Sequence, residues 1–187
     1  MTDLNCGRCG LCETRTNVVA GKGSSKAKLM LVGEAPGADE DLLGEPFVGR
    51  CGDLLTKMLS DSGIDREDVY ITNTVKCRPI DGKKNRPPKK EEIQSCKAWL
   101  WKEMQELSPK VIVTFGKVPT SLLLKIPKHK LKLGDVVGKM QSVDYTKSVI
   151  VPCYHPSYLM QTGRGKMQHS LDAISIAKDI SDGKTIF

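Results

Sequence analysis

Residues 28–52 read KLMLVGEAPGADEDLLGEPFVGRCG. The apolar run 29–32 predicts a buried strand, which breaks at the Gly- and Pro-containing loop 33–37, and a helix begins near Cys51. A strand that opens onto such a loop before a helix is where open α/β sheets bind ligands. Phe47 is a lone aromatic residue in the second half of this loop, where nothing local requires one. We therefore predict a ligand pocket here, with Phe47 as a stacking platform.

The rest of the chain alternates between predicted strands and helices. Apolar or β-branched runs predict strands over 69–72, 111–115 and 148–151, with a short one over 18–20. Helical spacing of apolar residues predicts helices over 53–62, 91–107 and 167–180. This alternation is typical of a mostly parallel sheet with helices on both faces. Because the carboxyl ends of parallel strands share one edge, Glu34, Asn73 and His155 should meet there.

Composition limits the classes of function. With 187 residues, a single compact domain over 1–187 is expected. The net charge of +7 favours a polyanionic partner such as nucleic acid, although a merely soluble basic surface would carry the same charge. An aromatic content of 5% argues against a general single-strand binder. No apolar run is long enough to span a membrane and the N-terminus lacks a signal core, so we expect no membrane contact and a cytoplasmic location.

Seven cysteines without a secretion signal favour metal or cluster ligation over disulfides. Cys6 and Cys9 form a C-x2-C pair, and Cys77 and Cys96 lie far downstream. Four thiolates gathered in this way could hold an iron–sulfur cluster or a zinc ion, and their spacing does not separate the two. Cys96 could also be a small buried residue on an apolar helix face.

Three separated motifs carry a resemblance to a known family. They read GEAPGADEDLLGEPFVGRCG over 33–52, ITNTVKCRP over 71–79 and YHPSYL over 154–159. With the cysteines they resemble family 4 uracil-DNA glycosylases, the iron–sulfur kind of archaea and bacteria, from Cys6 to about Leu159. The resemblance implies a three-layer sandwich with a central four-stranded, mostly parallel sheet. It also implies a 4Fe-4S cluster as cofactor, held by Cys6, Cys9, Cys77 and Cys96.

The resemblance further implies a monofunctional glycosylase that flips uracil out of DNA and hydrolyses its N-glycosidic bond, leaving an abasic site for base excision repair. Phe47 would stack on the flipped base, and Asn73 would read its O4 and N3–H edge. His155 would donate to uracil O2 as charge develops on the departing base. In the family, the position of Glu40 is implicated in excluding the thymine methyl group. The expected substrate-binding set is completed by Glu34, Ala35 and Pro36.

The group that activates water is the least determined part of this site. Better-known glycosylases carry an Asp where this chain has Ala35, so that base is absent. Glu34 is the nearest carboxylate and our first candidate, while Glu40 and Asp41 are further ones. The last two could instead be solvated acids near a helix start, where the helix dipole favours them. The expected catalytic residues are therefore Glu34 and His155.

The segment 156–166, PSYLMQTGRGK, resembles the family's loop that enters the DNA. One of its residues would wedge into the gap left by the base, and basic residues would bind phosphates. The alternative is a helix start with buried Leu and Met. Loop 80–90, rich in Pro and Lys, would lie against the duplex. The candidates for DNA contact are Tyr158, Leu159 and Met160 as wedges, with Arg164 and Lys166 for phosphates.

Uracil-containing DNA is thus the expected partner of a monomer in a prokaryotic cytoplasm, associated with the nucleoid. Residues 184–187, KTIF, are a candidate for contact with a sliding clamp or repair protein, although they lack a full motif. The rival hypothesis, from charge and cysteines alone, is a non-catalytic nucleic-acid-binding protein with a structural metal. A related branch that traps its product covalently has GEQPG and a histidine on a basic loop. This chain has GEAPG and no histidine over 80–90, which favours turnover.

Overall fold

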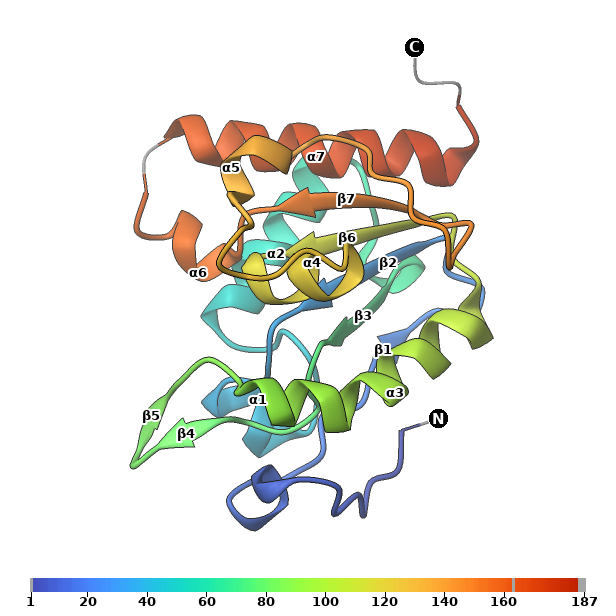
Figure 1. Cartoon of the computed structure of the whole chain (residues 1–187). Coiled ribbons are helices and arrows are strands. Elements are labelled where there is room, and N and C mark those ends of the chain that lie inside the picture. The colour runs from blue at the N-terminus through green and yellow to red at the C-terminus, as the bar shows by residue number, and fades with distance from the viewer. Residues whose placement is uncertain (1, 163, 185–187) are drawn as a thin grey trace.

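A five-stranded sheet forms the centre of the computed structural model, which describes residues 2–162 and 164–184 (Figure 1). The strand order is β1-β3-β2-β6-β7. The strands are β1 (Lys22–Gly23), β2 (Leu29–Gly33), β3 (Tyr70–Asn73), β6 (Val111–Phe115) and β7 (Val149–Cys153). Strands β3, β2, β6 and β7 run parallel, and β1 pairs antiparallel with β3 at the edge.

The predicted α/β class and mostly parallel sheet are confirmed, but the prediction of four strands misses β1. A strand was expected over 18–20, and these residues form none. Val18 is instead buried in a cluster with Cys77 and Cys96, and the N–H of Val19 donates to Lys76 O at 2.7 Å. Strand β1 has only two residues, and tertiary pairing with β3 creates it, so no local pattern announces it.

Helices cover both faces of the sheet and complete the expected three layers (Figure 1). One face carries α2 (Arg50–Asp61) and α7 (Arg164–Asp182), and the other carries α3 (Lys90–Leu107) and α4 (Lys117–Leu123). Successive side chains of a strand point to opposite faces. Leu31 of β2 accordingly packs in the cluster that holds Ile174 of α7, whereas its neighbour Met30 packs in the cluster that holds Leu100 of α3.

Short elements occupy the connections. The lysine-rich loop contains a hairpin of β4 (Ile80–Asp81) and β5 (Lys84–Asn85). The remaining elements are η1 (Gly10–Glu13), α1 (Ala38–Leu43), η2 (Arg66–Asp68), α5 (Leu133–Val136) and α6 (Pro156–Leu159). None of the helices within 2–162 and 164–184 is long and apolar enough to cross a membrane. The candidate clamp-binding segment lies outside the described residues beyond Lys184.

The carboxyl ends of the parallel strands share one side of the molecule, as predicted. Gly33 at the end of β2 is in register with Asn73 at the end of β3, and Phe115 of β6 is in register with Cys153 of β7. Figure 1 shows α6 and the β4–β5 hairpin on this same side, to the left of the strand tips. The fold therefore brings together the three motifs that are separated in the sequence.

Candidate active site

One cavity of about 900 Å³ opens at the carboxyl ends of the strands. All seven residues predicted to bind substrate line it: Glu34, Ala35, Pro36, Glu40, Phe47, Asn73 and His155. Tyr158 and Lys166 also line it, whereas Leu159 and Arg164 do not. Further lining residues that the sequence did not single out include Lys117, Lys132 and Tyr154.

Phe47 is held in a conformation that residues with a side chain rarely adopt. Its φ is 54°, in the left-handed region, and its ring is 5% exposed. The Arg66 guanidinium donates to the carbonyl oxygens of Pro46 at 3.2 Å and Phe47 at 2.8 Å, which fixes the backbone. Such strain persists where the surrounding structure enforces it, and it is concentrated at functional sites.

Asn73 and Phe47 meet at Gly33. A Cβ atom added to Gly33 would lie 2.3 Å from Asn73 Oδ1 and 2.6 Å from Phe47 Cζ, so only glycine leaves room for both side chains. Asn73 is 2% exposed, yet its carboxamide has no hydrogen-bond partner among residues 2–162 and 164–184. A buried amide that lines a cavity with its donors and acceptor unused is suited to a ligand that presents both.

His155 is the N-cap of α6, and this position determines where its proton lies. Its Nδ1 accepts from the backbone N–H of Ser157 at 3.2 Å and lies 2.8 Å from Ser157 Oγ. Since a backbone N–H can only donate, a neutral imidazole here carries its proton on Nε2. Burial lowers the pKa of His155 to about 4, with an opposing effect from Glu40. The site thus holds a neutral ring with one N–H available to a ligand.

The three candidate carboxylates have different roles. Burial raises the pKa of Glu34, Lys128 partly opposes this, and no residue in the described ranges hydrogen-bonds to its carboxylate. Glu40 is held by the backbone: its oxygens accept from the N–H groups of Gly37, Val48 and Gly49 at 3.0 to 3.1 Å. It therefore shapes the loop that carries Phe47. Asp41 accepts from Thr16 N at 3.0 Å and does not line the cavity, which argues against its candidacy for activating water.

The four cysteines expected as ligands line a second cavity. The N–H of Lys76 donates to Cys96 Sγ at 3.2 Å, and the Arg15 guanidinium donates to Cys77 Sγ at 3.5 Å. Among the residues that the structure describes, no Asp or Glu lines this cavity, whereas Arg8 and Arg15 do, so its surroundings suit an anionic group. Within the described part of the chain, no group of three or more His, Cys, Asp or Glu could hold a metal ion. Because the thiolates of a 4Fe-4S cluster bind four different irons, they need not converge on one point. The donor set therefore fits the cluster.

A buried lysine joins the two cavities. The Lys76 ammonium, 1% exposed, donates to Glu103 Oε2 at 2.7 Å, to Thr72 Oγ1 at 2.5 Å and to the carbonyl oxygen of Asn73 at 2.9 Å. Its backbone N–H donates to Cys96, and the next residue is Cys77. The segment 73–77 thus runs from the unpaired carboxamide to the cysteine site. Sequence reasoning missed Lys76, because its partner Glu103 is distant in the chain.

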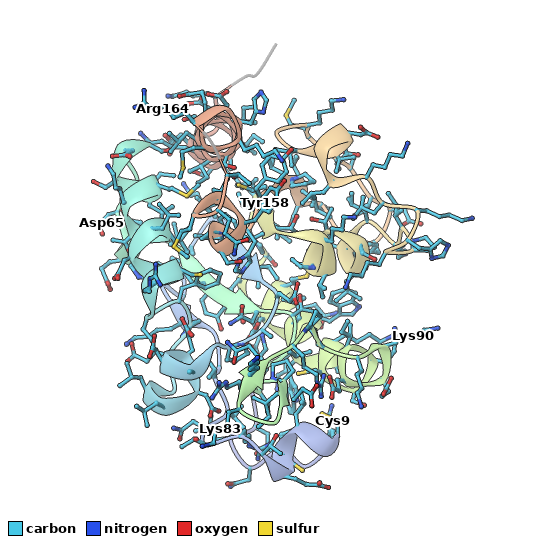
Figure 2. The ribbon with its side chains drawn as sticks, turned by 90° about the vertical axis from the view of Figure 1, so that its left-hand side faces the viewer. Cys9, Asp65, Lys83, Lys90, Tyr158 and Arg164 are labelled. Carbon is cyan, nitrogen blue, oxygen red and sulfur yellow. The ribbon has the colours of Figure 1, made fainter. Side chains whose placement is uncertain are left out.

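The segment after His155 divides between core and surface. Leu159 is 3% exposed and packs in the core with α2 and α7, so it does not fit the predicted role of a DNA wedge. Tyr158 and Met160 are 40% and 44% exposed and remain candidates. The Lys166 ammonium hydrogen-bonds to the Tyr158 hydroxyl and lies 4.5 Å from its ring centre. Figure 2, which faces the strand tips, shows Tyr158 and Lys83 on opposite sides of this surface, with Arg164 beyond Tyr158.

Comparisons with known proteins agree with this fold. The uracil DNA glycosylase superfamily matches residues 20–175. A type-4 uracil-DNA glycosylase of Archaeoglobus fulgidus is 40% identical, over 90% of this chain and 85% of its own length. Those of Thermotoga maritima and Saccharolobus solfataricus are 41% and 42% identical, over 87% and 81% of this chain and 82% and 71% of their own lengths. A type-5 uracil-DNA glycosylase of Pyrobaculum aerophilum is 33% identical over 76% of this chain and 67% of its own length. The chain therefore belongs to the uracil-DNA glycosylase superfamily, and within it to the type-4 family.

Proposed function

We propose that this protein excises uracil from DNA by hydrolysing the N-glycosidic bond, leaving an abasic site without cutting the strand. The observation that carries the proposal is the convergence of a buried unpaired carboxamide (Asn73), an aromatic ring (Phe47) and a neutral imidazole (His155) on one cavity. These are the groups needed to hold a flat, hydrogen-bonding base once it has been flipped out of the duplex.

Recognition of the base rests on Asn73 and Phe47. The carboxamide both accepts and donates, so it matches the N3–H and O4 edge of uracil, whereas cytosine presents an acceptor and an amine at those positions. The Phe47 ring provides a surface on which the base stacks. Glu40 contributes indirectly, because it holds the backbone on both sides of this loop.

Catalysis rests on His155. As the bond to the sugar breaks, negative charge develops on uracil O2, and the Nε2–H of the neutral imidazole donates to it. The ring is already buried and oriented by Ser157, so no reorganisation is required during the reaction. A preorganised donor of this kind is typically worth about 3 kcal/mol of barrier, or roughly a hundredfold in rate.

Glu34 is the proposed group for orienting water and stabilising the cationic sugar. Its carboxylate lines the cavity, is partly buried and has no hydrogen bond within residues 2–162 and 164–184. Its raised pKa makes it a stronger base than an exposed carboxylate. Glu40 is a weaker candidate for this role, because three backbone N–H groups already hold its carboxylate in the loop.

The proposed cofactor is a 4Fe-4S cluster held by Cys6, Cys9, Cys77 and Cys96. When bound, it would cross-link the N-terminal segment, the end of β3 and helix α3, and no step of the reaction is assigned to it. Support comes from the four thiols around one cavity and the N–H donors directed at two of them. Protein prepared anaerobically should contain about four irons per chain, and stoichiometric zinc without iron would contradict this.

The partner is proposed to be uracil-containing DNA, bound by a monomer in the cytoplasm. Tyr158 and Met160 are exposed beside the cavity and are the proposed wedges. Arg164 and Lys166, with the lysines of the β4–β5 hairpin, would bind phosphates. Arg86 of that loop is less available, because it pairs with Glu92 at 2.6 Å.

The test is excision from an oligonucleotide that contains one uracil, followed by alkaline cleavage at the abasic site. Asn73→Ala and His155→Ala should each slow single-turnover excision by about a hundredfold or more while duplex binding is largely retained. Asn5→Ala and His129→Ala alter exposed residues of the same types outside the cavity and should behave like the unmodified protein. Absence of alkali-dependent cleavage by protein with its cluster intact would refute the proposed activity.

A further inference from the structure

Trp99 presents a buried hydrogen-bond donor with no partner. Within residues 2–162 and 164–184, its Nε1 and Ser62 Oγ are the two side-chain polar atoms that have neither solvent access nor a hydrogen bond, whereas the unpaired Asn73 carboxamide lines the large cavity. Burying an N–H without an acceptor is unfavourable, so an unpaired indole indicates an acceptor that belongs at this place.

The position of Trp99 indicates which acceptor. It lies in α3 three residues after Cys96, so both side chains lie on the same face of the helix. Trp99 also lines the cavity shared by Cys6, Cys9, Cys77 and Cys96.

A cation lies over the indole ring. The Arg8 guanidinium carbon lies 4.4 Å from the centre of the Trp99 ring, and Arg8 stands between Cys6 and Cys9 in the sequence. The loop that carries two of the cysteines therefore also orients the ring. Since no carboxylate of the described residues lines this cavity, sulfur is the anionic acceptor that its side chains provide.

We propose that the Trp99 indole N–H donates to a sulfur of the iron–sulfur cluster, either a cysteine thiolate or an inorganic sulfide. This inference rests on the cofactor given under the proposed function. It adds a third donor to the Lys76 N–H and the Arg15 guanidinium, which already donate to Cys96 and Cys77. Hydrogen bonds to sulfur stabilise the more electron-rich state of a cluster and raise its reduction potential. Trp99 is thus assigned as a positioning residue for the cofactor.

The chain offers a matched control two residues away. Trp101 lies on the same helix but stacks on Tyr145, with ring centres 5.9 Å apart, and does not line the cysteine cavity. Trp99→Phe keeps an aromatic ring for Arg8 but removes the indole N–H together with part of the ring, whereas Trp101→Phe makes the same change, with the same loss of volume, away from the cluster.

The experiment compares both variants with the unmodified, iron-loaded protein. Electrode titration should give a more negative midpoint potential for Trp99→Phe alone, and iron release to a chelator should be about tenfold faster, as is typical when a hydrogen bond behind a metal ligand is lost. In the unmodified protein labelled with ¹⁵N-tryptophan, one of the two indole N–H signals should be shifted and broadened by the paramagnetic cluster. This last measurement needs no substitution.

The outcomes separate the inference from the cofactor proposal. If iron is present but both variants match the unmodified protein, and neither indole signal is shifted, the hydrogen bond is refuted and the cluster stands. Iron-free protein from an anaerobic preparation would refute the cofactor and, with it, the role of Trp99.

Discussion

The histidine that is proposed to stabilise the departing base should make the folded protein sensitive to acid. In the folded state, burial lowers the pKa of His155 to about 4, compared with about 6.5 for an unfolded chain. The unfolded state therefore binds the proton more readily. The stability that His155 contributes is fully present above about pH 6.5 and is lost as the pH falls towards 4.

The magnitude follows from the size of this shift. A difference of roughly 2.5 pKa units corresponds to about 3 kcal/mol in the limit of low pH. Between pH 7 and pH 5 the loss attributable to this one group is about 2 kcal/mol. The Ser157 N–H contributes to the effect, because protonation of Nδ1 would place a proton against this donor.

The assay is urea denaturation of the iron-loaded protein at pH 7 and pH 5, followed by tryptophan fluorescence. His155→Gln removes the titrating ring. The unfolding free energy of this variant should therefore decrease between pH 7 and pH 5 by about 2 kcal/mol less than that of the unmodified protein. His129→Gln changes an exposed histidine and should leave the loss as it is in the unmodified protein. If His155→Gln and the unmodified protein lose the same free energy, the imidazole is not held neutral by burial and the reasoning is wrong.

Three other changes test the remaining parts of the site. Glu34→Gln should slow excision by about a hundredfold at neutral pH. The kcat of the unmodified enzyme should fall as the pH drops through the raised pKa of Glu34, and Glu34→Gln should abolish that fall; an unchanged pH profile would exclude this residue as the base. Gly33→Ala places Cβ against Asn73 and should cost about 1–3 kcal/mol of stability or activation free energy, measured by denaturation and single-turnover rates, and normal values for both would contradict the steric argument. Lys76→Met leaves Glu103 buried without its cation and should lower the unfolding free energy by about 3–5 kcal/mol, most of which Lys76→Met with Glu103→Leu should restore.

Residues whose role is set by local sequence could be predicted. Residues 29–33 form the expected strand, and the strand ends bring Glu34, Asn73 and His155 to one cavity because parallel strands share an edge. The sequence also indicated that backbone N–H groups would hold the Glu40 carboxylate. Glu40 stands three residues after the helix N-cap Gly37, which is the spacing of a capping box.

Residues whose role depends on distant contacts could not be predicted. From the sequence alone, Leu159 and Tyr158 were equally good candidates for the DNA wedge. The packing of α6 against α2 directs the Leu159 side chain into the hydrophobic core, and this packing could not be predicted. The ion pair of Lys76 with Glu103 joins residues 27 positions apart, and a lysine after a strand ordinarily predicts a solvated side chain. Strand β1 likewise exists only through pairing with β3.

Gly33 and Gly52, which do not line the cavity themselves, set the tolerance of this pocket to mutation. A Cβ on Gly52 would lie 1.9 Å from the carbonyl oxygen of Phe47, and one on Gly33 would collide with Asn73 and Phe47. If a library of all single-substitution variants is selected for uracil repair activity, positions 33 and 52 should tolerate as few other residues as position 155. Redesign of the pocket for another damaged base is therefore limited first by the space that these glycines leave for Phe47 and Asn73. The choice of hydrogen-bonding groups is the second limit. Changes at Asn73 can alter which base is read only in a chain that keeps both glycines.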